Sequence, residues 1–364
     1  MTAPSDFMPA VRFELSEVKW FDGRVSRYTK TWDDLDQELK QEKDFGLAVK
    51  KAVNRLSAPL ATLIGDHSRT ELEKAQRLYR HFQQRFQWNG KFGPFASEGL
   101  DKAYREGSGS VGDINLGLVA ALQAAGFEAH PFLISTRNNG YPADIHPVIS
   151  DFNYVVAHLR LKDRIVLLDA TERLLPFGML PHRCLSNKGR VMDFEKSYWM
   201  EIPATGLFRE ITQLKLTLDS ASRLFGSYSA YKYDYAALKF RHEILETGDT
   251  AKYIREKEDA LDAMRIVNYR LRNLDSLDQP MIESYELSFD PQGEGRGVIY
   301  IPVLPLENME ENPFKLRERY YPVNFGTGWE IQNLVEINLP ENYRAATLPE
   351  AVGISLPPTG EVLS

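Results

Sequence analysis

Apolar side chains recur at steps of three and four residues in two stretches of the chain, and this spacing predicts two helices. In residues 71–86 the apolar stripe is wide enough to be buried in a core. Residues 107–125 read GSGSVGDINLGLVAALQAA, in which a glycine-rich turn leads into a helix with one apolar face. Residues 94–106 form a short approach with helical spacing. The helix that follows the glycine-rich turn is the most distinctive element of the sequence.

Candidate N-caps mark where two helices begin. Ser68 or Thr70 precedes the helix of residues 71–86. Thr31, with an acidic residue three positions later, opens a charged and helix-compatible segment over 31–54. Gly46 weakens the middle of that segment, because glycine is a poor helix former.

Strand patterns follow the central helix. Residues 127–135, 152–161 and 164–171 are rich in β-branched and aromatic side chains. Only Lys162 and Asp163 separate the last two strands, and a connection this short predicts an antiparallel hairpin. Helices followed by antiparallel strands indicate the α+β fold class.

From about residue 211 the chain changes to alternating apolar and polar positions. This alternation predicts strands that would build a β-sandwich, over 211–220, 223–244, 281–290, 295–304 and 329–340. One interruption, over 250–274, has helical spacing and predicts an inserted helix hairpin or a long helix.

Composition and charge exclude several classes of protein. The 364 residues, of which 43% are apolar, are enough for two or three domains. A net charge of −7 without a long basic run argues against nucleic-acid and anionic-membrane partners. The single cysteine, Cys184, rules out an intrachain disulfide framework and a cysteine-rich zinc site. Scattered histidines without a ligand spacing predict no metal, and no cofactor is expected.

The two ends of the chain show no complete targeting signal. The first residues have no basic segment followed by an apolar one, so a signal peptide is not expected there. No apolar run is long enough to predict a membrane helix. Residues 356–360, LPPTG, match a sortase sorting pattern, but no apolar span follows, and a Pro/Gly loop explains the match equally well.

Four short segments resemble one enzyme family. GSGSVGD at 107–113, FNY at 152–154 and LDAT at 168–171 are similar to the site segments of transglutaminase-like, papain-type hydrolases. NPFKLRERYYPVNFG at 312–326 is similar to the C-terminal domain of the bacterial exported members, in which a transglutaminase-like core lies between two β-sandwiches. The resemblance implies a periplasmic or exported parent protein.

The resemblance divides the chain into three parts. Residues 1–32, with the pattern of a strand or a hairpin over 8–31, are expected to be the tail of an upstream β domain or a linker. Residues 33–205 are expected to form the papain-like transglutaminase core, and 206–364 a C-terminal β-sandwich with the helical insertion.

In this family a cysteine, a histidine and an aspartate form the catalytic triad, and the matching positions here are Val111, Tyr154 and Asp169. Valine has no nucleophilic atom, and a phenol with a pKa of about 10 is a poor base at neutral pH. The triad therefore cannot operate as written. With no histidine left to orient, Asp169 is expected to be a strand-end carboxylate that accepts backbone N–H bonds or the Tyr154 hydroxyl.

Other residues could replace the missing groups. Ser110, Ser108 or Cys184 could be a relocated nucleophile, although Cys184 lies in a loop without a helix N-terminus to activate it. His158 shares a strand face with Tyr154 but lies about 13 Å along the strand, so a packed histidine is the favoured interpretation. His146, in the preceding loop, is an outside candidate.

The sequence thus predicts a catalytically inactive binding or scaffolding module. A peptide, protein or glycan would lie in the former cleft, whose candidate lining is Trp88, Phe92, Ser110, Tyr154 and His158. The alternative is an amide hydrolase or acyltransferase that uses Ser110 or Cys184. A purely structural domain is a third reading. The G-x-G-x-x-G spacing of Gly107, Gly109 and Gly112 does not indicate a nucleotide site, because no buried strand precedes it.

Overall fold

The computed structural model describes residues 3–9, 15, 17–27, 30–65, 69–143, 145, 147–259, 264–289, 298–299, 301, 317–318 and 322–353. The N-terminal half contains η1 (Pro4–Phe7), β1 (Glu17–Lys19), β2 (Val25–Arg27), α1 (Trp32–Gln41), α2 (Gly46–Leu56), α3 (Ala61–Ile64), α4 (Glu71–Arg85), β3 (Gln87–Trp88), α5 (Leu100–Glu106), β4 (Ser108–Gly109), α6 (Val111–Ala124), β5 (Glu128–Ile134), η2 (Ile149–Asp151), β6 (Tyr154–Arg160) and β7 (Ile165–Leu168). The C-terminal half contains η3 (His182–Cys184), β8 (Lys188–Val191), β9 (Tyr198–Glu201), β10 (Phe208–Leu218), β11 (Leu224–Tyr233), α7 (Asp234–Thr247), α8 (Thr250–Asp259), β12 (Arg265–Arg272), β13 (Met281–Phe289) and β14 (Trp329–Asn338). The mixed content confirms the α+β class.

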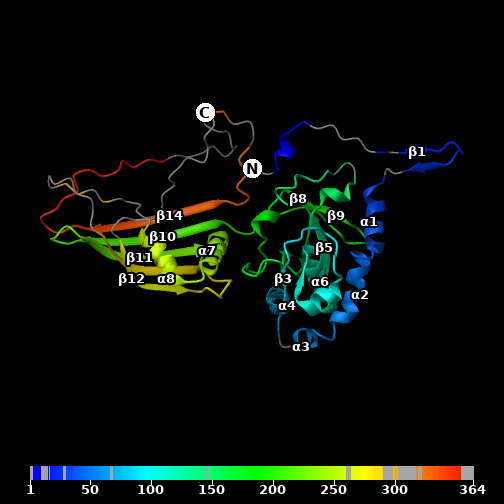
Figure 1. The fold of residues 1–364 in the computed structure, drawn as a ribbon, viewed down its shortest axis with the longest axis horizontal. Coiled ribbons are helices and arrows are strands. Elements are labelled where there is room, and N and C mark those ends of the chain that lie inside the picture. The colour runs from blue at the N-terminus through cyan, green and yellow to red at the C-terminus, as the bar shows by residue number, and fades with distance from the viewer. Residues whose placement is uncertain are drawn as a thin grey trace.

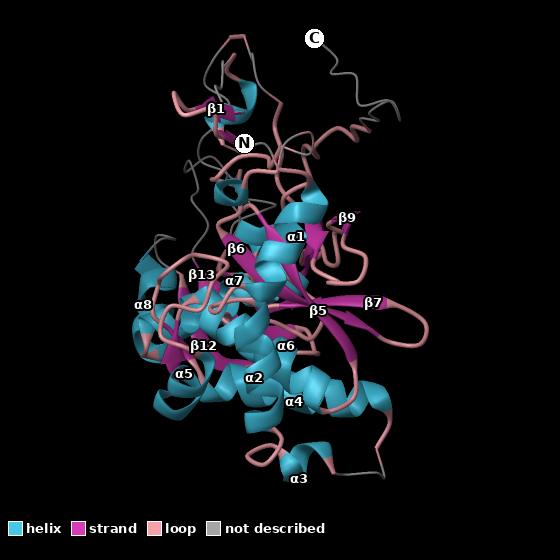
Figure 2. Cartoon of the chain, turned by 90° about the vertical axis from the view of Figure 1, so that its right-hand side faces the viewer, coloured by secondary structure: helices cyan, strands magenta, loops and turns pink. Residues whose placement is uncertain are grey.

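Figure 1 shows two bodies side by side, one built around α6 and the other around the long strands β10 to β14. In the first body, five antiparallel strands lie in the order β7-β6-β5-β8-β9. Helix α6 contacts β5 and β6 on one side and α2, α4 and α5 on the others. Figure 2 shows these helices gathered against the sheet. Because α6 is enclosed on all sides, its residues from Val111 to Leu122 are all buried.

Helices α1 and α2 occupy the segment 31–54, in which the sequence predicts helix with a weak middle. Thr31 caps α1 through a capping box with Asp34. The chain then leaves the helix at Glu42 and resumes it at Gly46. A Cβ on Gly46 would meet the carbonyl oxygens of Leu39 and Lys40, so the close approach of the two helices requires glycine.

A buried ion pair fixes α1 to strand β8 of the first sheet. Arg190 on β8 donates from Nε and Nη2 to the two carboxylate oxygens of Asp36 on α1, over 3.0 and 2.6 Å. The guanidinium lies 4.7 Å from the ring centre of Trp32 and 5.9 Å from that of Trp199. Both charged side chains are buried, so each compensates the charge of the other in place of water.

The second body is one five-stranded sheet in the order β12-β13-β11-β10-β14. Strand β14 runs parallel to β10, whereas the other neighbours are antiparallel. Helices α7 and α8 contact this sheet. Ile254 of α8 packs against an apolar cluster that includes Leu214 and Tyr228, whereas α7 forms a second cluster with Tyr253 and Met281. The described residues thus form one sheet with helices packed on it, where the sequence predicts two packed sheets.

Two predicted elements differ from the structure. The strand predicted over 223–244 ends at Tyr233, and α7 takes the rest, because Ala237, Phe240 and Ile244 lie at helical spacing and are buried on one helix face. The helix predicted over 250–274 ends at Asp259 and β12 follows, so the helical insertion is the pair α7 and α8. Of the strand predicted over 295–304, only 298–299 and 301 are described.

The two bodies join between β9 and β10 and contact each other through apolar and polar groups, because Tyr235 and Leu238 of α7 belong to the core cluster of the first body. Tyr235 donates from its hydroxyl to the carbonyl of Leu180 over 2.7 Å. His242 Nε2 lies 3.2 Å from a carboxylate oxygen of Glu172, and a guanidinium–carboxylate pair joins Arg80 to Asp278. Within the described segments, no helix combines the length and the apolar character that crossing a bilayer requires.

Candidate functional site

The glycine-rich turn places Ser110 as the N-cap of α6. Its Oγ donates to Asp113 Oδ2 over 2.8 Å and accepts from the Asp113 backbone N–H over 3.2 Å. Asp113 also accepts the N–H groups of Ser97 and Glu98 over 3.0 and 3.1 Å, which ties the preceding loop to the turn. Ser110 is only 2% exposed. Its hydroxyl is therefore engaged in capping the helix and does not face an open cleft.

Val111 is the first residue of α6 and is fully buried. Its backbone N–H donates to the Lys91 carbonyl over 3.1 Å. A Cβ on the adjacent Gly112 would clash with the Phe95 backbone, so the loop around residues 91–95 packs directly on the start of the helix. The N-terminus of α6 is thus covered by chain, and its first side chain is aliphatic.

Tyr154 and Asp169 meet in the interior. Tyr154 starts β6, Asp169 follows β7, and both are 0% exposed. The Tyr154 hydroxyl donates to Asp169 Oδ2 over 2.7 Å. Burial, and then the charge of Asp169, raise the pKa of the Tyr154 phenol well above its usual value. At neutral pH this phenol stays protonated and acts as a donor, so it cannot serve as a base.

Asp169 is surrounded by further donors. Asn115 Nδ2 on α6 donates to Asp169 Oδ1 over 2.9 Å, and Thr171 donates to the same oxygen from its backbone N–H and its hydroxyl, over 2.9 and 2.7 Å. Arg183 donates to the hydroxyl oxygens of Tyr154 and Thr171, over 3.0 and 2.7 Å. The two hydroxyls therefore accept from a cation and donate to a carboxylate. This closed network is the arrangement of a satisfied buried charge.

Aromatic side chains cover the network on its outer side. The Arg183 guanidinium lies 4.7 Å from the ring centre of Trp88, and the Phe92 ring packs edge-on against Trp88 and Tyr154, with centroids 5.3 and 5.8 Å apart. Trp88 is held beside the turn because β3 pairs with β4. Phe92 is 49% exposed. Of the five predicted cleft residues, Trp88 and Phe92 reach the surface, whereas Ser110, Tyr154 and His158 are buried.

Cys184 lies at the end of η3, fully buried, with Sγ 3.9 Å from Asp169 Oδ2. Burial, and then the neighbouring carboxylate, raise the pKa of the Cys184 thiol well above its usual value. A reactive cysteine requires the opposite, an exposed site that favours the thiolate. The Cys184 thiol is therefore a packed side chain and not an activated nucleophile.

His158 lies on β6 opposite His130 on β5, away from Asp169. Its Nε2 lies 3.3 Å from the Tyr198 hydroxyl, and its side chain is fully buried. Burial, followed by His130 and Arg160, lowers the pKa of His158 to about 4. The imidazole is neutral near pH 7 and makes its contacts in a different part of the sheet from Tyr154. His146 lies outside the described residues.

Three members of the network, Asn115, Thr171 and Arg183, are not identified by sequence reasoning. Thr171 is part of the LDAT segment, which was a usable signal. Asn115, a polar residue between Ile114 and Leu116 in a mostly apolar helix, was a second signal. Among the described residues, no group of three histidine, cysteine, aspartate or glutamate side chains is placed to hold a metal ion.

Known proteins offer limited similarity. Residues 297–363 match the Domain of Unknown Function DUF3858, a segment that includes β14. A crystal structure from Parabacteroides distasonis, described as a "putative protease", is similar over 78% of this chain and 58% of its own, with 11% identity and a TM-score of 0.40. The chain thus spans somewhat more than half the length of that protein. A search of curated proteins finds no match.

Proposed function

We propose that this chain is a catalytically inactive transglutaminase-like protein that acts as a binding or scaffolding module. The observation that carries the proposal is the pairing of Tyr154 with Asp169, because a tyrosine donates to the carboxylate where the family resemblance implies a histidine. Val111 at the start of α6 supplies no nucleophile in the position implied for the cysteine. The helix packed on antiparallel strands β5 and β6 supports the papain-like part of the proposal.

The relocated-nucleophile alternative has less support. Ser110 donates its hydroxyl proton to Asp113, which in turn accepts three backbone N–H groups and the Ser97 hydroxyl, so this carboxylate is the partner of a helix cap. Cys184 is a buried thiol with a raised pKa. Among the described residues, neither group has a hydrogen bond to an imidazole, the base that nucleophilic catalysis by serine or cysteine commonly uses.

The ligand surface we favour is the outer face of the covered site, formed by Trp88, Phe92 and Arg183. Its two rings lie edge-to-face, and the Arg183 side chain is one-quarter exposed. Aromatic and arginine side chains with an exposed edge suit contacts with an extended peptide or a glycan ring. A ligand there would bind without reaching Tyr154 or Asp169.

A probe experiment tests the absence of catalysis. The intact protein is treated with a fluorophosphonate and with iodoacetamide, alongside Ser110→Ala and Cys184→Ala variants. We expect no stoichiometric labelling of the native fold. Labelling of one site that disappears in either variant, together with amide hydrolysis, would establish the enzyme instead.

A second experiment tests the family assignment. In a Cys184→Ala background, Val111→Cys places a thiol at the N-terminus of α6, and Tyr154→His adds an imidazole next to Asp169. The pKa of the introduced thiol is measured from the ultraviolet absorbance of its thiolate. We expect this pKa to lie below about 8.5 only when both changes are present. A thiol pKa that stays at or above about 8.5 when Val111→Cys and Tyr154→His are combined would contradict a triad geometry at these positions.

A further inference from the structure

A pocket between α2 and α5, remote from the Tyr154 network, concentrates positive charge. Its cavity measures about 290 Å³, and its lining includes the cations Lys43, Lys51, Arg55, Lys102 and Arg105. Only two acidic residues line it, so its formal charge is +3 in a protein whose net charge is −7. A cavity with a local charge opposite to that of the whole molecule attracts anions selectively.

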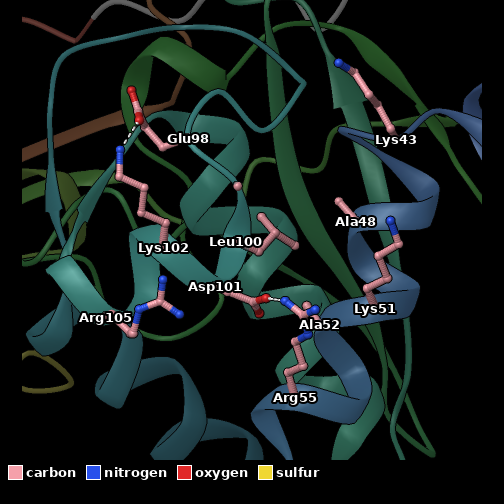
Figure 3. Close-up of a pocket in the computed structure, with 11 residues that line it drawn as sticks. Lys43, Ala48, Lys51, Ala52, Arg55, Glu98, Leu100, Asp101, Lys102 and Arg105 are labelled. Atoms are coloured by element: carbon pink, nitrogen blue, oxygen red, sulfur yellow. Dashed lines mark hydrogen bonds and ion pairs between the residues drawn. The ribbon is translucent and has the colours of Figure 1, made fainter.

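The two acidic residues already have partners within the pocket. Asp101 pairs with the Arg55 guanidinium, and Glu98 lies 2.7 Å from Lys102 Nζ. No carboxylate among the described residues pairs with Lys51 or Arg105. Figure 3 shows these two side chains on opposite sides of the pocket, Lys51 on α2 and Arg105 on α5. Two cations facing one cavity without counter-charges are available to an entering ligand.

The floor of the pocket is apolar. Ala52 and Leu100 are 1% and 5% exposed, and Ala48 lies one helical turn before Ala52 on the same face of α2. Small side chains on α2 keep the cavity open above Leu100. A ligand would therefore meet hydrocarbon at its base and cations around its rim, an arrangement that suits an organic body with an anionic group.

The geometry points to a binding site for a small organic phosphate in this pocket. A phosphomonoester carries up to two negative charges, which the rim of net charge +3 can neutralise, and arginine binds phosphate oxygens in pairs. The cavity is at the lower end of the range for small-molecule sites, which limits the ligand to a single ring or a short chain. The inference is independent of whether the chain has catalytic activity.

Calorimetric titration of the full chain with phenyl phosphate tests the site. We expect saturable one-to-one binding that weakens with added salt, and about tenfold weaker binding of inorganic phosphate, which cannot use the apolar floor. The Lys51→Gln/Arg105→Gln variant is expected to lose about tenfold or more in affinity. Both residues are exposed, so the fold should be retained.

The control is Lys50→Gln/Arg164→Gln, which removes the same charge from exposed positions outside the pocket. We expect it to bind phenyl phosphate as the unmodified protein does. Equal weakening in both double variants would show that only overall charge matters, and the proposed site would be wrong. Failure of phenyl phosphate to saturate, or affinity equal to that of inorganic phosphate, would overturn it as well.

Discussion

Replacing Tyr154 with phenylalanine removes one oxygen atom from the centre of the buried network. The ring keeps its packing against Phe92. The lost oxygen donates to Asp169 over 2.7 Å and accepts from Arg183 over 3.0 and 3.2 Å. Both partners are charged, so the substitution isolates the contribution of the hydroxyl to a buried ion pair.

The expected cost follows from the partners that remain. Hydrogen bonds to charged groups contribute about 1.5–3 kcal/mol each. Asp169 keeps its bonds from Asn115 and Thr171, and Arg183 keeps Thr171, so neither charge is left without a partner. We therefore expect the free energy of unfolding to fall by about 2–3 kcal/mol. At about 2–4 °C per kcal/mol for a domain of this size, Tm should fall by about 4–12 °C.

Thermal unfolding followed by tryptophan fluorescence and by calorimetry measures the loss. Tyr235→Phe is the matched control, because it removes another buried phenolic oxygen whose acceptor, the Leu180 carbonyl, is neutral. Its expected cost is about 1 kcal/mol.

The reasoning would be refuted if the Tyr154 and Tyr235 variants lost the same stability. That result would mean that the Tyr154 hydroxyl contributes no more than an ordinary hydrogen bond. The charged partners of Tyr154 would then not be what makes its hydroxyl stabilising.

Further substitutions test two other buried ionisable sites, His158 and the Asp36–Arg190 pair. His158 has a pKa of about 4 in the folded protein and about 6.5 in the unfolded chain, so the unfolded chain binds more protons between these pH values. The free energy of unfolding should therefore fall as the pH falls through this window, by about 2.5 kcal/mol at pH 4.5. Urea unfolding at a series of pH values should show a shallower decline for His158→Gln, and equal slopes would contradict the lowered pKa. Asp36→Asn leaves the buried Arg190 without its counter-charge, so the free energy of unfolding, measured with urea, should fall by about 3–5 kcal/mol. Adding Arg190→Met should recover part of this loss. A loss below about 1 kcal/mol, the value of an exposed ion pair, would show that the pair is hydrated.

Local signals explain which elements the sequence predicts well. Thr31, Thr70 and Ser110 each form a capping box with an acidic residue three positions later, so the starts of α1, α4 and α6 are encoded within four residues. Helical spacing over 71–86 and 107–125 identifies α4 and α6 for the same reason, since the whole pattern lies within the element.

Elements that depend on distant contacts are predicted poorly. The change from β11 to α7 falls inside YKYDYAAL, where alternating tyrosines favour strand until Asp234 adopts a positive φ of 44° and its side chain accepts the Leu207 N–H. β8 and β9 are four residues each, too short for periodicity to identify, and Arg190 and Trp199 in them are polar or bulky.

The site shows the same limit. Val111, Tyr154 and Asp169 are found through short motifs, but their surroundings are not. Asn115 lies 54 residues from Asp169 in sequence, and Arg183 lies 29 residues from Tyr154. No local pattern around Arg183, which lies in η3, indicates that its guanidinium would enter the network, because its partners Tyr154 and Thr171 are distant in sequence.

The parallel pairing of β14 with β10 sets an order of events during synthesis. β10 leaves the ribosome more than a hundred residues before β14, so its edge waits, unpaired, while the intervening chain is made. The first body can complete its sheet in that interval, because β5 to β9 are close together in sequence. Loss of the segment that contains β14 would leave β10 as an open edge, a template for pairing with other copies. The outer edge of β10 is therefore covered only when translation is nearly finished.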